Sequence, residues 1–147
     1  MFRIRQSALA LPLALVFTQS ATAQPAKSTE PVPYPGGPDT ECAIAAAVIA
    51  TLPPMIAFDP VLRGTGDADK TDCTTAFTAA HIKLLAYDPG DRTSVFTMLS
   101  RPLRTANGQA SIDVAAIGPG YRKSQTYVLA QKAGQWTVVS ARVNAES

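Results

Sequence analysis

The chain has 147 residues, of which 13 are Lys or Arg and 11 are Asp or Glu, and 46% of its residues are hydrophobic. Loss of the N-terminal segment described below removes Arg3 and Arg5 and leaves 11 residues of each sign, so the charge gives no argument for a nucleic-acid partner. The length fits one ordinary domain with one hydrophobic core.

Residues 1–23 have the pattern of a secretory signal peptide. Two arginines precede an uncharged apolar run over residues 8–17, and Ala21-Thr22-Ala23 offers the small side chains that signal peptidase requires. The run has about half the length of a membrane span, which disfavours the alternative of an uncleaved anchor. We expect a mature protein that begins at Gln24, is periplasmic or secreted, and is not inserted in a membrane after cleavage.

A proline-rich leader is predicted over residues 24–39. The segment contains five prolines and two glycines, which deny the backbone the hydrogen bonds of helices and strands. This composition indicates a flexible, extended segment. A proline-rich ligand for a partner protein is the alternative, and a plain spacer is favoured over it. A single folded domain is expected over residues 40–147.

Two helices are predicted in the first half of this domain. The first begins near Thr40 and ends at Pro53-Pro54, and the second begins at Thr71 or Asp72 and ends before Pro89-Gly90. Each presents one apolar face, made of Cys42, Ala45, Ile49 and Leu52 in the first helix and of Cys73, Ala76, Phe77, Ala80 and Leu84 in the second. Residues 55–58 fit either a strand or an irregular buried segment, and residues 64–70 form a polar loop.

From Ser94 onward the apolar pattern has a period of two, which predicts strands. Asn107-Gly108 and Ala133-Gly134 are hairpin turns, and Gly118-Pro119-Gly120 is the loop between them. The expected strands span residues 94–99, 103–106, 109–117, 125–132 and 135–143. We therefore predict an α+β fold, with N-terminal helices packed on a four- to five-strand antiparallel β-meander.

The end of the chain resembles small uncharacterised exported bacterial proteins. The matching segments are Ser100-Arg101-Pro102, Asn107-Gly108, Ile117-Gly118-Pro119 and Gly134-Gln135-Trp136-Thr137-Val138. Such proteins end in a β-meander with a Gly-x-Trp-x-Val strand, and a helix followed by such a meander is similar to the cystatin-like and NTF2-like architectures. The resemblance covers residues 94–143. It implies a fold type and transfers no catalytic residue to this chain.

Cys42 and Cys73 are the two cysteines of the chain. In an exported protein such a pair predicts a disulfide, which here would join the starts of the two expected helices. The alternative of a redox-active pair is disfavoured, because the sequence has no Cys-x-x-Cys motif.

The remaining motifs favour neither catalysis nor a cofactor. Residues 64–71 depart from a phosphate-binding loop at Asp69, whose carboxylate would oppose phosphate. As an EF-hand loop the same region fails at Asp72 and Thr78, which leaves a weak cation site or a solvated acidic loop. His81 is expected to pack along the core from the second helix. We predict no catalytic residue, no metal site and no cofactor.

Charge is divided between the two halves of the mature chain. Residues 24–91 carry a net −5 and residues 92–147 a net +5. The structural explanation is attraction between the halves, and the functional one is a basic sheet face or loop at Tyr121, Arg122 and Lys123 that meets an acidic partner. We expect a non-catalytic binding or interaction module for a protein or small molecule. The alternative is a small hydrolase or isomerase with a pocket between helix and sheet, and with His81 or an aspartate as its base.

Overall fold

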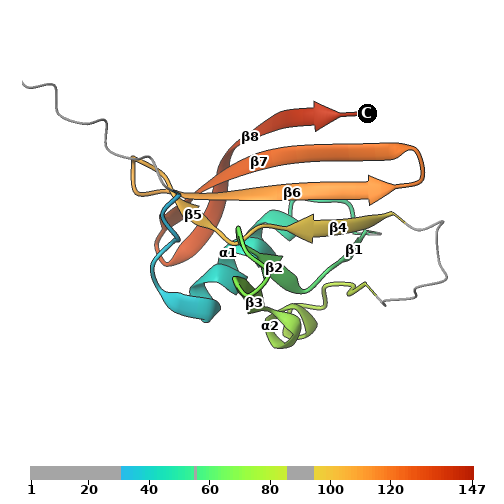
Figure 1. Ribbon diagram of the computed structural model, residues 1–147. Coiled ribbons are helices and arrows are strands. Elements are labelled where there is room, and N and C mark those ends of the chain that lie inside the picture. The colour runs from blue at the N-terminus through green and yellow to red at the C-terminus, as the bar shows by residue number, and fades with distance from the viewer. Residues whose placement is uncertain (1–30, 55, 86–94) are drawn as a thin grey trace, which may run out of the picture.

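The computed structural model describes residues 31–54, 56–85 and 95–147, so the expected signal peptide and the first part of the leader lie outside it (Figure 1). Its elements are α1 (Gly37–Ile49), β1 (Ala57–Phe58), β2 (Val61–Arg63), β3 (Lys70–Asp72), α2 (Thr74–Ala79), β4 (Phe96–Leu99), β5 (Leu103–Arg104), β6 (Ala110–Gly118), β7 (Tyr121–Lys132) and β8 (Gln135–Glu146). Neither described helix is long and apolar enough to cross a membrane.

The described strands form one six-stranded sheet and one two-stranded ribbon. The sheet has the order β1-β4-β6-β7-β8, with β5 also paired to β6, and the ribbon consists of β2 and β3. The α+β class is as predicted, but the sheet is mixed because β1 runs parallel to β4, with Ala57 opposite Phe96. A parallel neighbour needs a long crossover, and the residues between these two strands supply it.

The first helix begins at Gly37, three residues before the expected start at Thr40. Gly36 has a φ of 119°, a conformation that glycine adopts without strain, and it turns the chain into the helix. Pro38 fits the first turn because the backbone N–H that it lacks would have no partner there. Residues at the end of the expected leader therefore belong to α1.

The second helix is shorter than expected, because Thr71 and Asp72 lie in β3 and α2 ends at Ala79. His81 follows with a φ of 57°, its N–H bonds the carbonyl of Thr78 at 3.1 Å, and the N–H of Ile82 bonds that of Phe77 at 3.0 Å. These two bonds form a Schellman motif, which terminates a helix. His81 is exposed, so the expectation that it packs along the core is wrong.

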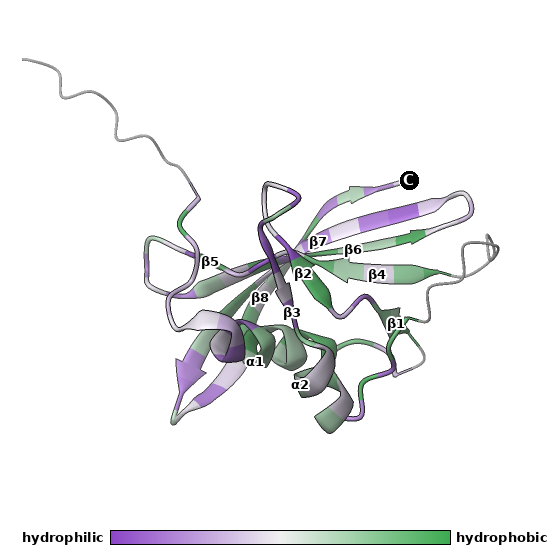
Figure 2. Cartoon of the chain, turned by 60° about the horizontal axis from the view of Figure 1, so that its bottom comes forward, coloured by the Kyte–Doolittle hydropathy of each residue, from purple (hydrophilic) through white to green (hydrophobic). Residues whose placement is uncertain are grey.

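The hydrophobic core lies between the helices and one face of the sheet, which we call the helix-side face. Figure 2 shows both helices on this side, and the end of the β6–β7 hairpin extends beyond them. The buried residues of the core include Ile44, Val48 and Phe77 from the helices and Leu99, Ile112 and Leu129 from the sheet. The strand residues that alternate with these core residues form the opposite, outer face, and they include Asp113, Ser124 and Thr126.

Two β-bulges interrupt the pairing of β8 with β7. The register shifts leave Val139 and Asn144 of β8 without an opposite residue. The strict alternation expected along residues 136–143 is therefore wrong, because Val138, Ala141 and Val143 all lie on the helix-side face, opposite Leu129, Tyr127 and Gln125.

The last part of the expected leader is fixed against the sheet. The carbonyl of Val32 accepts a hydrogen bond from the N–H of Arg104 at 2.8 Å, and the N–H of Tyr34 donates to the carbonyl of Pro102 at 2.9 Å. The ring of Tyr34 meets that of Trp136 in a T-shaped arrangement, with centroids 5.2 Å apart. Residues 32–34 thus extend the folded domain before α1.

Candidate functional site

The disulfide between Cys42 and Cys73 is present, as predicted, with the two Cα atoms 5.4 Å apart. Cys42 lies in α1 and Cys73 is the N-cap residue of α2, and both are buried. The bond ties the two helices together beneath the sheet. It is consistent with a compartment outside the cytoplasm, where disulfides persist.

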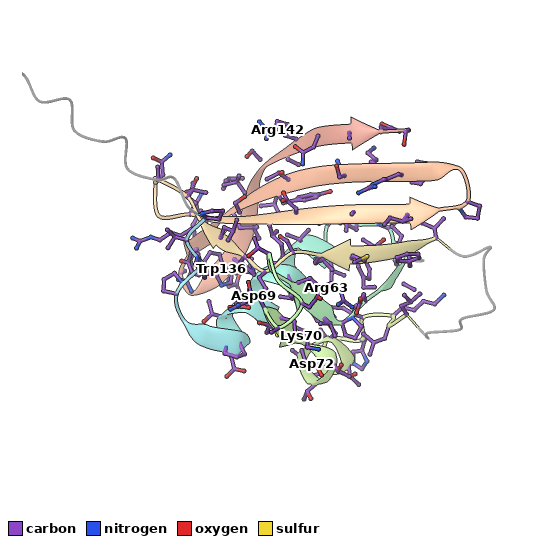
Figure 3. All side chains as sticks on the ribbon, viewed as in Figure 1. Arg63, Asp69, Lys70, Asp72, Trp136 and Arg142 are labelled. Atoms are coloured by element: carbon purple, nitrogen blue, oxygen red, sulfur yellow. A yellow bond between two sulfur atoms is a disulfide. The ribbon has the colours of Figure 1, made fainter. Side chains whose placement is uncertain are left out.

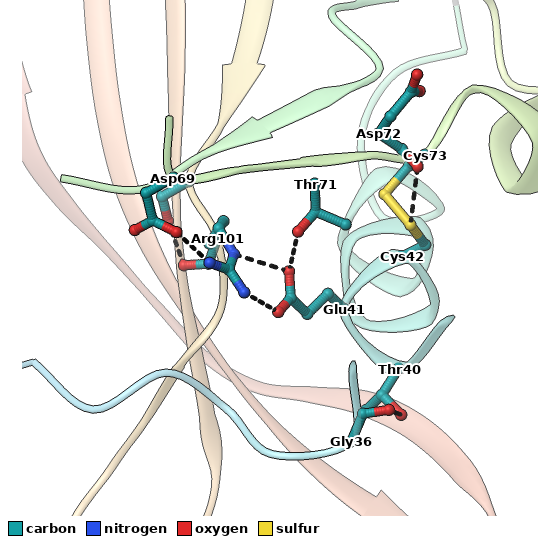
Figure 4. Close-up of polar contacts among 10 residues, drawn as sticks. Gly36, Thr40, Glu41, Cys42, Asp69, Thr71, Asp72, Cys73 and Arg101 are labelled. Atoms are coloured by element: carbon teal, nitrogen blue, oxygen red, sulfur yellow. Dashed lines mark hydrogen bonds and ion pairs between the residues drawn. A yellow bond between two sulfur atoms is a disulfide. The ribbon is translucent and has the colours of Figure 1, made fainter. Parts of the chain in front are cut away.

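An ion-pair network centred on the buried Glu41 lies beside the disulfide, and its Arg101 and Asp69 side chains are 25% and 39% exposed (Figure 4). Glu41 is 2% exposed and accepts three hydrogen bonds, from Arg101 Nε at 3.0 Å, from Arg101 Nη2 at 2.5 Å and from Thr71 Oγ1 at 2.5 Å. Arg101 Nη1 also donates to Asp69. The network therefore joins α1, the β2–β3 ribbon and the connection that follows β4.

The charges of this network are mutually stabilised. Burial by itself would raise the pKa of Glu41, but the hydrogen bonds from Arg101 and Thr71 outweigh it and hold that pKa below its usual value. Hydrogen bonds to Glu41 and Asp69 raise the pKa of Arg101 above its usual value. Because Arg101 comes from the basic half of the chain and both acids from the acidic half, this contact supports the structural explanation of the charge division.

Sequence reasoning missed this network. The available signal was Glu41 itself, a carboxylate in a helix that is otherwise nearly apolar on all sides. The acidic loop over residues 64–70 connects β2 and β3, where Asp69 faces Arg101. Asp72 accepts hydrogen bonds from the side chain and the backbone of Thr74, which lower its pKa and satisfy the first N–H group of α2.

The outer face of the sheet carries a depression made of two adjacent hollows. One, of about 260 Å³, crosses the strands and is lined by Arg63, Met98, Leu99, Ser100, Asp113, Val114, Ala115, Ser124 and Asn144. The other, of about 470 Å³, opens beside it between the leader and the β2–β3 ribbon, and its lining includes Pro33, Gly64, Asp69 and Leu103. Both hollows are lined by Arg63, Ser100 and Asp113, so they lie side by side.

A chain of hydrogen bonds crosses the outer face from β6 to β8. Thr126 Oγ1 donates to Asp113 Oδ1 at 2.5 Å, and Asn144 Nδ2 donates to Thr126 Oγ1 at 2.8 Å. Arg142 Nε in turn donates to Asn144 Oδ1 at 3.3 Å. This chain orders polar side chains that lie on an open surface, and it ends on a guanidinium group at the sheet edge, labelled in Figure 3.

The structure does not bring Tyr121, Arg122 and Lys123 to one surface. They lie at the start of β7, directly after the turn at Pro119-Gly120, and not in a loop. Successive strand residues face opposite ways, so Arg122 lies on the outer face while the other two lie on the helix-side face. Lys123 Nζ is 3.9 Å from Glu146 Oε2, and Arg122 is exposed.

Three guanidinium groups instead mark the outer face, and we call Arg63, Arg122 and Arg142 the outer arginines. Arg63 lines both hollows, with its side chain 52% exposed and Nη2 3.1 Å from Asp59 Oδ2. Arg122 precedes Ser124 by two residues on one face of β7, and Arg142 pairs with Thr126. No family model, curated protein or solved structure matches this chain.

Proposed function

We propose that the protein is a non-catalytic binding module, exported from the cytoplasm, that recognises an acidic partner on the outer face of its sheet. The observation that carries the proposal is the depression across β4, β6, β7 and β8, which Arg63 lines and beside which Arg142 bonds the lining residue Asn144, with Arg122 further along the same face of β7. The disulfide supports export, and the expected cleavage after Ala23 is tested by the intact mass of protein recovered outside the cytoplasm.

The chemistry of the outer arginines favours carboxylate groups as ligands. A guanidinium has five N–H donors in a planar fork that matches a carboxylate. Arg142 uses one nitrogen on Asn144, and Arg63 uses one on Asp59. Further donors on both groups face solvent, as does the exposed side chain of Arg122. An acidic partner would be steered to this face and paired there.

The carboxylates of the depression support binding rather than general-base catalysis. Asp69 accepts a hydrogen bond from Arg101, and Asp113 accepts one from Thr126. Each is thus engaged as an acceptor within the protein. Asp113 is also exposed, and Asp69 is paired with Arg101, so neither is the buried carboxylate that general-base catalysis near neutral pH usually employs.

The test uses labelled polyglutamate as a defined acidic polypeptide, with binding followed by fluorescence anisotropy at several salt concentrations. The double variant Arg122→Glu/Arg142→Glu should lose about tenfold or more in affinity, which corresponds to roughly 1.4 kcal/mol. The double variant Lys83→Glu/Lys132→Glu is the matched control, since both lysines are exposed, neither is an outer arginine, and the change in net charge is the same. Equal losses in the two variants, or no binding by the unaltered protein, would overturn the proposal.

A further inference from the structure

Strand β8 forms one edge of the sheet, and its second half is exposed to solvent. It is the last strand in the sheet order, and among the described residues it pairs with β7 alone. Residues 139–146 are exposed on both faces, including Val139 at 45% and Val143 at 49%. Figure 1 shows this half of β8 lying beyond the helices. A bare edge offers unpaired N–H and C=O groups to another strand.

The pairing with β7 shows which backbone groups of β8 are free. Arg122 and Ser147 exchange two hydrogen bonds, each of 2.9 Å, so even-numbered residues of β7 bond toward β8 in this ladder. The opposite residues, Arg142 and Ser140, therefore use their backbone groups on β7. It follows that the N–H and C=O groups of Ala141 and Val143 point to the free edge.

The two bulges confine this free edge to a short window. Val139 and Asn144 are the bulged residues, so residues 140–143 form the regular stretch between them. Bulges twist an edge away from long strand pairing, which protects a protein against aggregation. A window of this length suits a short peptide segment and disfavours extensive pairing between sheets.

We propose that residues 140–143 bind an extended acidic segment of a partner polypeptide as an added antiparallel strand. Ala141 and Val143 supply the backbone bonds, and Arg142 meets an Asp or Glu of the segment on the outer face. The neighbouring partner residues lie on the helix-side face against Val143 and are apolar. The inference rests on the proposed function, because it names the form in which the acidic partner binds.

The charge of this region favours such a segment over a second copy of the chain. Antiparallel self-pairing of β8 around residues 140–143 would bring the Arg142 side chains of both copies together on one face, and like charges opposite each other are destabilising. An alternating apolar and acidic segment instead supplies the opposite charge on one face and apolar contacts on the other. Dimer formation by the protein alone is an outcome that would count against the proposal.

The first test compares three labelled peptides of about seven residues, the length of a short strand. The first alternates Val and Glu, the second has the same sequence with alternate backbone nitrogens methylated on the side that would face β8, and the third has the same composition in Val-Val-Glu-Glu order. The alternating peptide should bind at least about tenfold more tightly than either control. The methylated peptide has the same charge as the alternating one, so its weaker binding would report the loss of backbone hydrogen bonds alone. Equal binding of the methylated and unmethylated peptides would overturn strand addition.

The second test changes the protein at the free edge. Ala141→Pro removes an N–H group that points away from β7, and proline is tolerated at such edge positions. Ala141→Val is the matched control that keeps this group. The proline variant should no longer bind the alternating peptide, while the affinity of the valine variant should be within about threefold of that of the unaltered protein. If the proline variant melts early, the methylated peptide alone decides.

The two proposals fail in different ways. If the alternating and control peptides bind alike while Arg122→Glu/Arg142→Glu still abolishes polyglutamate binding, strand addition is overturned and the outer-face module stands. If no acidic peptide or polyglutamate binds at all, both proposals are overturned.

Discussion

Arg101 donates two hydrogen bonds to Glu41, which lies sixty residues earlier in the chain, and so joins the β4–β5 connection to the first helix. The guanidinium reaches the carboxylate side-on through Nε and Nη2, at 3.0 and 2.5 Å. This bidentate contact satisfies a carboxylate that is almost fully buried. The guanidinium group therefore fastens α1 to the connection after β4, in addition to the core packing of Ile44 and Val48.

Replacement of Arg101 by Met should lower the free energy of unfolding by about 3 kcal/mol, because it leaves the buried Glu41 charge without its partner. The double variant Glu41→Gln/Arg101→Met should lose less free energy of unfolding than the two single variants together. Gln carries no charge, so no unpaired charge is left buried when Arg101 is replaced. Urea unfolding of the four proteins gives the coupling energy. Strictly additive losses would show that the two groups do not depend on each other.

The lowered pKa of Glu41 predicts a loss of stability in acid. A carboxyl group whose pKa is lower in the folded than in the unfolded protein stabilises the fold. The stabilisation is complete at pH values above the pKa of the unfolded protein, here the ordinary 4.5. This contribution should be constant above that pH and disappear as the pH falls through the lowered folded-state pKa. The melting temperature of Glu41→Gln should fall less over that pH range than that of the unaltered protein, in thermal melts at fixed ionic strength. Parallel curves for the two proteins would contradict the assignment.

Local signals in the sequence were enough to predict much of the fold. The positive φ values of Ala133 and Gly134, 50° and 77°, suit a tight hairpin turn, as their sequence indicated. The disulfide followed from the expected export and from the number of cysteines. The missed elements depend on pairings between distant segments. Thr71 belongs to β3 and not to a helix, because it is buried opposite Leu62 and bonded to Glu41.

The candidate site was harder to predict for the same reason. Strand alternation separates Arg122 from Lys123, whereas the predicted basic sheet face or loop at these residues needed both side chains on one surface. Arg142 comes onto the outer face beside Thr126 only once the bulge at Val139 has shifted the register of β8. A bulge leaves no mark in the apolar pattern strong enough to locate it.

Reduction of the Cys42–Cys73 bond should destabilise the protein by about 3–4 kcal/mol, the chain-entropy value for a loop of this size. The two residues are 31 positions apart, and their bond crosslinks α1 to α2. Cys42→Ala/Cys73→Ala should therefore melt well below the oxidised protein, in thermal melts followed by far-ultraviolet circular dichroism. An unchanged melting temperature after reduction would show that packing alone fixes the two helices.

The last prediction concerns His81, which occupies the left-handed position of the Schellman motif that ends α2. This position usually holds glycine, because a side chain there brings Cβ close to the following carbonyl at a cost of about 1 kcal/mol. His81→Gly should relieve that strain and raise the free energy of unfolding by about 0.5 kcal/mol, since the greater freedom of glycine in the unfolded chain offsets part of the gain.

His81→Val should lower the free energy of unfolding by about 1 kcal/mol or more, because a β-branched side chain is poorly accommodated at positive φ. His81→Asn is the control that keeps a polar side chain tolerated in this conformation. The expected order of stability is Gly, then His and Asn, then Val, measured by denaturant unfolding. The exposed imidazole contributes no core packing, so losses of equal size in all three variants would show that the side chain itself stabilises the protein and that the backbone argument is wrong.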